Sequence, residues 1–168
     1  MRSPTLLLIL ACTLVACGGS DSGGPVDSGL PAERKGSELS DAEAEQLCEA
    51  SARHLASQLD NDDIHHFNCV FQAIAAASIS GMVETCEGIY DMCIQMPYTP
   101  DDSGGACMLG DLTMCQATVG DMEACFTERN NATATAFKAA SCNDLGKEPT
   151  EPTDGPACSK ARASCPGI

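Results

Sequence analysis

Apolar residues recur at helical spacing in four segments of the chain, and this pattern predicts an all-α fold. In the first segment, residues 41–59, Leu47, Leu55 and Leu59 recur at helical spacing. Ser40 and Glu43 stand where a capping box would begin that helix, because the Ser hydroxyl and the Glu carboxylate satisfy each other's backbone amides. The first segment is therefore expected to be a helix that ends before an acidic turn.

The second helical segment follows that turn, with Asp62 or Asp63 as its expected N-cap. Phe67 and Ile74 mark its apolar face, and Gly81 is a suitable residue for its C-terminal stop. A helical hairpin of this segment with the first could form across the acidic turn.

The third and fourth segments complete the pattern. Val83 and Ile94 share a face of the third, which should end before Pro97. The fourth starts at Thr118, and Asn130–Asn131 could break or kink it. The sequence thus predicts about four helices, a number set by the periodic segments.

The remaining segments are rich in Gly, Pro, Ser and charge, which favours loops. Residues 18–38 lack periodicity and are expected to form a disordered tether, and residues 97–106 a loop. Residues 107–116 are ambiguous and could hold one helical turn. The expected organisation is a signal peptide (1–16), a lipidated Cys and flexible tether (17–38), a helical cysteine-rich domain (39–142) and an irregular Pro/Gly-rich tail with a local Cys pair (143–168).

The N-terminus has the features of an export signal. Arg2 precedes the apolar run Thr5–Ala16, which is shorter than the roughly 20 residues needed to span a bilayer. Leu14 is too large for the −3 position of an ordinary signal-peptidase site. Uncleaved anchoring and ordinary secretion are the alternatives that this segment leaves open.

The sequence Leu-Val-Ala-Cys that ends this run resembles the bacterial lipobox. The resemblance implies cleavage between Ala16 and Cys17, diacylglycerol on the Cys17 thiol and a fatty acyl chain such as palmitate on its amine. Gly18, in place of Asp, implies sorting to the outer membrane. Two lipidated positions would anchor the chain firmly, because each buried CH₂ contributes about 0.8 kcal/mol.

Composition then restricts the partners. The chain has a formal charge of −15 at pH 7, and removal of Arg2 with the signal makes it one unit more negative. Such a chain repels nucleic acid and anionic head groups, so neither is expected as an electrostatic partner. No later apolar run is long enough to span a membrane. The expected partners are the membrane, through the lipid anchor, and an unknown envelope or extracellular protein.

Cysteine is the most informative residue type. Twelve are present, of which Cys12 leaves with the signal and Cys17 carries lipid. An even number remains in an exported chain, which predicts five disulfides. Metal binding is the rival use, but tight Cys-x₂-Cys pairs are missing. The ten cysteines expected in disulfides are Cys48, Cys69, Cys86, Cys93, Cys107, Cys115, Cys125, Cys142, Cys158 and Cys165.

Helical geometry excludes some pairings. Two cysteines seven residues apart on one helix, such as Cys86 and Cys93, lie about 10 Å apart, too far for a disulfide. The same holds for Cys125 and Cys142 if their helix is continuous. Bonds between different helices remain, and we expect a local Cys158–Cys165 bond in the tail. The full connectivity stays open.

Two stretches carry a further resemblance. Residues 39–43 (Leu-Ser-Asp-Ala-Glu) precede Leu47-Cys48, and residues 115–125 read Cys-Gln-Ala-Thr-Val-Gly-Asp-Met-Glu-Ala-Cys. With the lipobox and tether, they resemble the small cysteine-rich lipoproteins of myxobacteria and their relatives. The resemblance covers roughly residues 39–142 and implies a Gram-negative host and an all-α, disulfide-stapled body. It implies no mechanism, because those proteins are mostly of unknown function.

Candidate chemistry is sparse. His54, His65 and His66 are the three histidines, and a helical hairpin could bring them near Asp62 and Asp63. Adjacent helical residues point about 100° apart, however, so His65 and His66 rarely ligate one ion together. The acidic turn lacks the spacing of a calcium loop. No nucleophile elbow and no free reactive cysteine is expected.

These observations favour a lipid-anchored cell-envelope protein of structural or interaction type, without catalytic activity, cofactor or metal. The alternative is an envelope enzyme, or a small-ligand or metal binder, that uses His54, His65 and His66.

Overall fold

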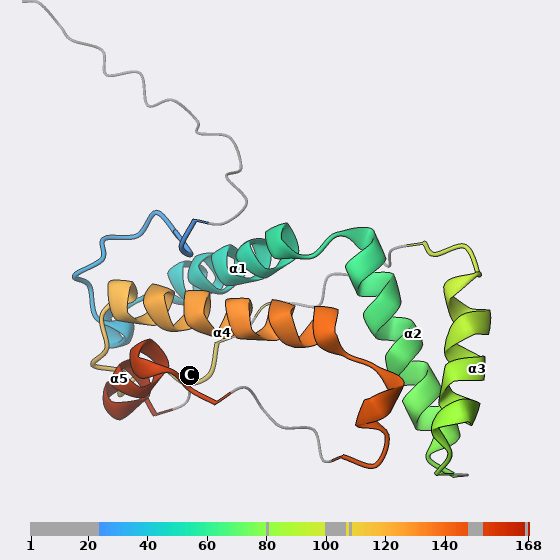
Figure 1. Ribbon diagram of the computed structural model, residues 1–168. Helices are drawn as coiled ribbons and strands as arrows, with labels where there is room; N and C mark the ends of the chain where they lie inside the picture. The colour runs from blue at the N-terminus through green and yellow to red at the C-terminus, as the bar shows by residue number, and fades with distance from the viewer. Residues whose placement is uncertain (1–23, 80, 100–106, 108, 148–152, 167) are drawn as a thin grey trace, which may run out of the picture.

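The computed structural model describes residues 24–79, 81–99, 107, 109–147, 153–166 and 168, so Ala16 and Cys17 lie outside the described residues. Across these ranges the chain is helical and contains no β-strand, which confirms the predicted all-α class (Figure 1). None of the described helices is both long enough and apolar enough to cross a bilayer. The elements are η1 (Gly36–Glu38), α1 (Asp41–Gln58), α2 (Asn61–Ala77), α3 (Val83–Ile94), α4 (Val119–Ala139), η2 (Cys142–Asp144) and α5 (Pro156–Ser164).

The predicted capping box of α1 is present. The Glu43 amide donates to Ser40 Oγ at 3.4 Å, and the Ser40 amide donates to Glu43 Oε2 at 3.0 Å. The pair satisfies two backbone donors that the first turn leaves without helical partners. Local sequence therefore sets the start of this helix.

The expected cap of α2 is wrong by two or three residues. Asp60, rather than Asp62 or Asp63, is the N-cap, and its Oδ1 accepts the Asp63 amide at 2.8 Å. Asp63 Oδ2 accepts the Asp60 amide in return at 3.2 Å. This reciprocal pair satisfies two donors at once, which explains why the helix starts earlier. Gly81 follows the helix with φ +68° and donates to the Ala77 carbonyl.

Helix α4 starts after Thr118, as predicted, and continues through Asn130 and Asn131 without a break. The Asn130 side chain is buried and donates from Nδ2 to the Ser51 carbonyl on α1 at 2.8 Å. The Asn130 side chain makes its hydrogen bond to another helix and not to the backbone of α4. It therefore does not compete with the hydrogen bonds of α4, and the helix is not interrupted.

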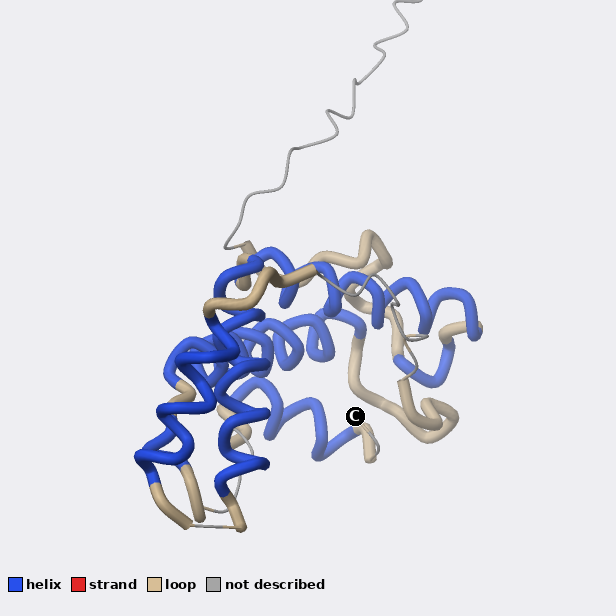
Figure 2. Tube along the Cα trace, turned by 90° about the vertical axis from the view of Figure 1, so that its right-hand side faces the viewer, coloured by secondary structure: helices blue, strands red, loops and turns tan. Residues whose placement is uncertain are grey.

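The helices form two regions. Helices α1 and α4 lie side by side with α5 against α4, while α2 crosses their end and packs against α3 (Figures 1 and 2). We call the first group the α1–α4–α5 lobe and the second the α2–α3 hairpin. Each has its own core. The lobe core includes Leu47, Val119, Met122, Phe126 and Ala161. The hairpin core is Ala73, Ala77, Cys86 and Cys142, flanked by Ile74, Val83, Ile89, Tyr90 and Leu145.

The first turns of α2 join the two regions. Phe67 stacks on Phe137 of α4, with ring centroids 3.8 Å apart. Beside them Lys138 Nζ lies 3.2 Å from an Asp63 carboxylate oxygen. Aromatic contact and an ion pair thus hold the hairpin against the end of α4.

The expectation of a disordered tether is wrong for residues 24–38. Val26 is 3% exposed, and its amide donates to Thr127 Oγ1 at 2.8 Å. Ser28 is also buried and donates from both its amide and its hydroxyl to Glu123 Oε1. Polar side chains of α4 replace water as partners of this backbone, so a segment without periodicity is nevertheless ordered. Residues 18–23 of the expected tether lie outside the described residues.

The expectation of an irregular tail with a Cys158–Cys165 bond is also wrong. Residues Pro156–Ser164 form α5, with Pro156 at its first turn, where a missing amide costs nothing. Cys158, Ala161 and Cys165 are fully buried in the lobe core. A helix between Cys158 and Cys165 separates them, by the same geometry that keeps Cys86 and Cys93 apart.

The ten cysteines pair as five disulfides, as their number predicts. The bonds are Cys48–Cys107, Cys69–Cys93, Cys86–Cys142, Cys115–Cys165 and Cys125–Cys158. Both pairings that helical geometry excludes, Cys86 with Cys93 and Cys125 with Cys142, are avoided. Three bonds staple the lobe and the other two staple the hairpin, which is why neither region needs a large apolar core.

Candidate functional site

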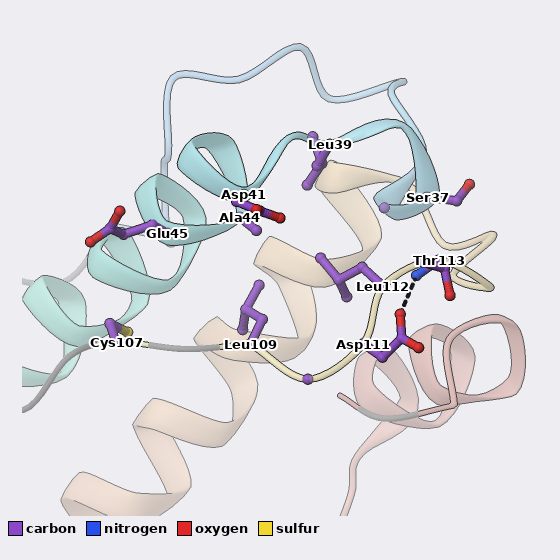
Figure 3. Close-up of a pocket in the computed structure, with 12 residues that line it drawn as sticks. Ser37, Leu39, Asp41, Ala44, Glu45, Cys107, Leu109, Asp111, Leu112 and Thr113 are labelled. Atoms are coloured by element: carbon purple, nitrogen blue, oxygen red, sulfur yellow. Dashed lines mark hydrogen bonds between the residues drawn. The ribbon is translucent and has the colours of Figure 1, made fainter.

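A surface pocket of about 520 Å³ lies between the start of α1 and the segment 107–113 (Figure 3). Residues of η1 close one side of it. The lining residues are Gly36, Ser37, Leu39, Asp41, Ala44, Glu45, Cys107, Leu109, Gly110, Asp111, Leu112 and Thr113. Two stretches that are distant in sequence, residues 36–45 and residues 107–113, thus build one concave surface.

The floor of the pocket is apolar. Leu39, Leu109 and Leu112 are half-buried and pack against the lobe core. The side chains of Leu109 and Leu112 point from the segment 107–113 into the pocket, and Ala44 is a small residue on the α1 side of it (Figure 3). The rigid core behind these leucines means that the floor is formed before any ligand arrives.

The rim is acidic. Asp41, Glu45 and Asp111 are exposed, and among the described lining residues none is basic. Asp41 and Glu45 are four residues apart on α1, so they share a helix face. The Thr113 amide donates to Asp111 Oδ1 at 2.9 Å, and this bond with the Thr113 hydroxyl lowers the pKa of Asp111. Asp111 therefore stays negative at neutral pH.

Two disulfides fix the wall that carries Leu109 and Asp111. Cys107 is bonded to Cys48 on α1, and Cys115 is bonded to Cys165 after α5. The segment between them is thus covalently held at both ends. A segment held in this way loses little conformational entropy when a ligand binds.

Backbone hydrogen bonds align η1 with the same wall. The Gly36 amide donates to the Ala117 carbonyl and the Ser37 amide to the Cys115 carbonyl, both at 2.9 Å. A Cβ on Gly36 would lie 2.5 Å from Cys115 Sγ, far inside van der Waals contact. Glycine at position 36 is therefore what lets η1 approach the disulfide.

Helix α1 is held beside η1 by one ion pair. Arg34 Nη1 lies 2.5 Å from Glu43 Oε1, and both side chains are about 30% exposed. The Arg34 hydrogen bond, with further bonds from the Ser40 amide and hydroxyl, lowers the pKa of Glu43 to about 2. Glu43 therefore remains ionised and keeps this side of the pocket in place down to acidic pH.

The structure does not bring the three histidines together. His54 is buried, with Nε2 2.9 Å from the Gly24 carbonyl and Nδ1 3.2 Å from Asn130 Nδ2. A carbonyl can only accept, so Nε2 carries the proton and Nδ1 accepts. Both ring nitrogens of His54 are used to hold residues 24–28 and α4, which makes it a structural residue.

His66 has the same kind of role at the junction of the two regions. Its Nε2 lies 3.0 Å from the Ala140 carbonyl and its Nδ1 3.0 Å from the Tyr90 hydroxyl. His65, one residue earlier, points elsewhere and stacks on Tyr98 with ring centroids 4.9 Å apart. The shared metal or catalytic site that the alternative reading requires is therefore not assembled from His54, His65 and His66.

The pocket lining favours binding over acyl-transfer chemistry. Its hydroxyl groups are those of Ser37 and Thr113, and no histidine is found among its described lining residues. Cys107 is in a disulfide and has no thiol to act as a nucleophile. What the site offers a ligand is an apolar surface surrounded by carboxylates.

Sequence patterns alone do not reveal this pocket. The only local signal is the i, i+4 pair Asp41 and Glu45 beside Ala44, which marks one acidic helix face. Leu109, Asp111 and Leu112 stand in the stretch whose secondary structure the sequence leaves ambiguous. Their position depends on Cys48 and Cys165, whose pairing cannot be deduced from spacing.

No protein-family model, no curated protein and no solved structure matches this chain.

Proposed function

We propose that this protein is a lipid-anchored cell-envelope binding module whose pocket takes a basic, partly apolar segment of a partner protein. The observation that supports the proposal is the pocket itself, with leucines as its floor and Asp41, Glu45 and Asp111 on its rim. A lysine or arginine side chain has an apolar stem and a cationic end, so it can use both surfaces at once. The role is one of interaction, with no catalytic step.

The charge of the whole molecule supports the same class of partner. A formal charge of −15 steers cationic partners toward the surface and repels anionic ones. Charged rims raise association rates and exclude wrong partners, while a desolvated apolar centre supplies most of the affinity. The pocket combines both features in one place.

The proposed place of the protein at the membrane rests on the lipobox-like sequence at residues 14–17. Gly24 is the first described residue, and its carbonyl is fixed to His54. Gly24 comes seven positions after Cys17, so even a fully extended chain between them reaches at most about 25 Å. A lipid on Cys17 would therefore keep the lobe close to the membrane surface, where an envelope partner could be met.

Replacement of the three rim carboxylates tests the proposed binding. We expect Asp41→Asn/Glu45→Gln/Asp111→Asn to weaken binding of an amphipathic lysine–leucine peptide at least tenfold, because the charges face its ammonium groups. Isothermal titration at low and moderate salt measures the affinity, and its salt dependence should also decrease.

A control with the same change in net charge separates the pocket from bulk attraction. Glu84→Gln/Glu87→Gln/Asp91→Asn removes three exposed carboxylates from α3, away from the pocket. This variant should bind the peptide with nearly native affinity. Equal losses in the two triple variants would mean that only the overall charge attracts the peptide, and the pocket proposal would fail.

The anchor is tested separately. Cys17→Ala should leave a precursor that is neither cleaved nor labelled by a fatty-acid probe, because the lipid-accepting thiol is missing. Normal labelling of this variant in the host would contradict the proposed lipid anchor, but it would leave the pocket proposal standing.

A further inference from the structure

One of the five disulfides has a histidine beside it. Cys69 on α2 is bonded to Cys93 on α3, and His65 lies one helical turn before Cys69. A ring nitrogen of His65 and the two sulfur atoms all lie within 4.8 Å of one another. In the part of the chain that the structure describes, this is the one place where three metal-ligating side chains converge so closely.

Burial and packing hold the three side chains of this cluster in place. Cys69 is fully buried and Cys93 is 7% exposed, while His65 is half-buried. The His65 ring stacks on Tyr98 with an interplanar angle of 13°, which limits its rotation. The imidazole is therefore held next to the sulfurs by packing from outside the pair.

We propose that the Cys69–Cys93 pair has a second, reduced state in which Cys69, Cys93 and His65 bind one zinc ion. In tetrahedral zinc sites the Zn–S and Zn–N bonds are about 2.3 and 2.0–2.1 Å, which places ligand atoms roughly 3.5–3.8 Å apart. The present spacing of the imidazole nitrogen from the sulfurs already falls within reach of this range. The sulfurs of Cys69 and Cys93 must move apart from their bonded distance to the spacing of zinc ligands, and reduction of the disulfide permits this.

Charge favours zinc over a monovalent soft ion in this site. Two thiolates carry two negative charges, which a divalent ion neutralises, and the imidazole is neutral as a ligand. A monovalent copper ion would leave one net negative charge on buried groups, which is costly. Three protein ligands leave the fourth position of the zinc ion to water, as in open zinc sites.

The change of state is a balanced exchange with an external dithiol. The dithiol donates two electrons and two protons to the disulfide, so that it becomes a disulfide itself and Cys69 and Cys93 become thiols. Zinc then replaces the two thiol protons, which are released to solvent. Cys93 is the more exposed of the two residues, 7% against 0%, so its sulfur is the one that an incoming thiolate would attack.

The hairpin has other connections that would hold it during this exchange. Cys86–Cys142 ties α3 to η2, and Ala73 and Ala77 pack against Cys86 in the hairpin core. The Phe67–Phe137 stack fixes α2 to α4. The proposed zinc site lies in the hairpin and does not depend on the pocket in the lobe.

A redox titration with and without zinc tests the proposal. The oxidised protein is equilibrated in dithiol–disulfide buffers in which few disulfides are reduced, with free zinc held by a metal buffer. Thiols are then alkylated and mapped by mass spectrometry. Zinc should raise the reduced-to-oxidised ratio of Cys69–Cys93 at least tenfold, because a ligand that binds one state shifts the equilibrium toward it. The ratio for Cys86–Cys142, a second hairpin disulfide, should change less than twofold.

His65→Phe is the decisive variant, because it keeps a ring against Tyr98 and removes the metal ligand. It should lose most of the zinc effect while it retains the circular dichroism of the oxidised protein. Cobalt added to the partly reduced protein should show thiolate charge-transfer absorption that this variant lacks. An equal zinc effect in His65→Phe, an equal effect on Cys86–Cys142, or no effect at all would overturn the proposed site.

Discussion

The α1–α4–α5 lobe and the α2–α3 hairpin are built from the same kinds of residues but are stabilised differently. The lobe buries Leu47, Val119, Met122 and Phe126 in one core, and three disulfides surround it. The hairpin core consists mainly of alanine and cysteine. Small side chains bury little apolar area, so the hairpin depends more heavily on its two disulfides.

The hairpin also exposes more large apolar side chains than the lobe does. Five of the six large apolar side chains that are most exposed in the described chain belong to the hairpin: Phe71, Ile79, Met82, Met92 and Met96. The sixth, Met114, lies beside the pocket wall of the lobe. A region that cannot bury its large side chains has fewer contacts to oppose local opening. Covalent links therefore replace packing where packing is weakest.

The largest expected effect comes from removal of a hairpin disulfide. The bond Cys86–Cys142 spans 56 residues of sequence, and its loss should cost about 4 kcal/mol on the loop-entropy scale. Amide hydrogen exchange of Cys86→Ala/Cys142→Ala should show lost protection in α2 and α3. Protection in α1 and α4 should be retained, because the lobe core and its disulfides are untouched.

Removal of the lobe disulfide Cys125–Cys158 is the matching experiment in the other region. Cys125→Ala/Cys158→Ala should lower protection throughout α1, α4 and α5, since Cys125 and Cys158 are part of that core. If each double variant lost protection uniformly over all five described helices, the molecule would be one cooperative unit and the distinction between two regions would be wrong.

Two glycine substitutions should move stability in opposite directions. Gly36→Ala places a methyl group against Cys115 in the lobe and should destabilise the protein by about 1–3 kcal/mol, as overpacking does. Gly88→Ala on α3 meets no atom within 4 Å and should stabilise the hairpin by roughly 0.5–1 kcal/mol, because alanine favours the helix.

Urea unfolding with the disulfides intact measures both glycine variants. Peptide binding adds a second measurement for Gly36→Ala, since η1 forms one side of the pocket. A neutral effect of Gly36→Ala would show that η1 can move away from Cys115, and the pocket would then be less rigid than described.

The smallest expected effect is a change in how the stability of the lobe depends on pH. The folded pKa of Glu43 is about 2, below its ordinary value of 4.5, so its ionised form stabilises the lobe. That stability is fully present above pH 4.5 and is lost as pH falls toward 2. Glu43→Gln should therefore make the lobe less stable at neutral pH and flatten the decrease in stability between pH 4.5 and 2.

Thermal unfolding at several pH values follows this effect. Glu87→Gln on the hairpin is the control, because Glu87 is an exposed glutamate on α3 and lies outside the lobe that the Arg34–Glu43 pair stabilises. An unchanged pH profile for Glu43→Gln would mean that the Arg34–Glu43 pair contributes nothing measurable, as holds for many surface ion pairs.

Prediction from sequence succeeded where the signal was local. The Ser40–Glu43 capping box and Thr118 begin their helices at the expected residues, and α3 spans Val83–Ile94 before Pro97. Caps and periodicity act within a few residues, so each segment carries its own information. Asp60 was missed because three acidic residues in one turn compete for the same role, and reciprocal hydrogen bonds decide among them.

Prediction failed where a segment depends on distant partners. Val26 and Ser28 are ordered by Thr127 and Glu123, about 100 residues away, and nothing in their own composition shows it. The same holds for Cys158, whose partner is Cys125 on α4. A segment rich in Gly and Pro can be fixed by side chains that another helix presents.

The helical class, several helix ends, the number of disulfides and two pairings that cannot occur follow from the sequence alone, because local geometry and parity set them. Tertiary structure alone decided the five actual bonds, the burial of residues 24–28 and α5, the separation of His54 from His66, and the pocket. Each of these requires residues from different helices to meet, and chain path, rather than residue type, determines which residues do.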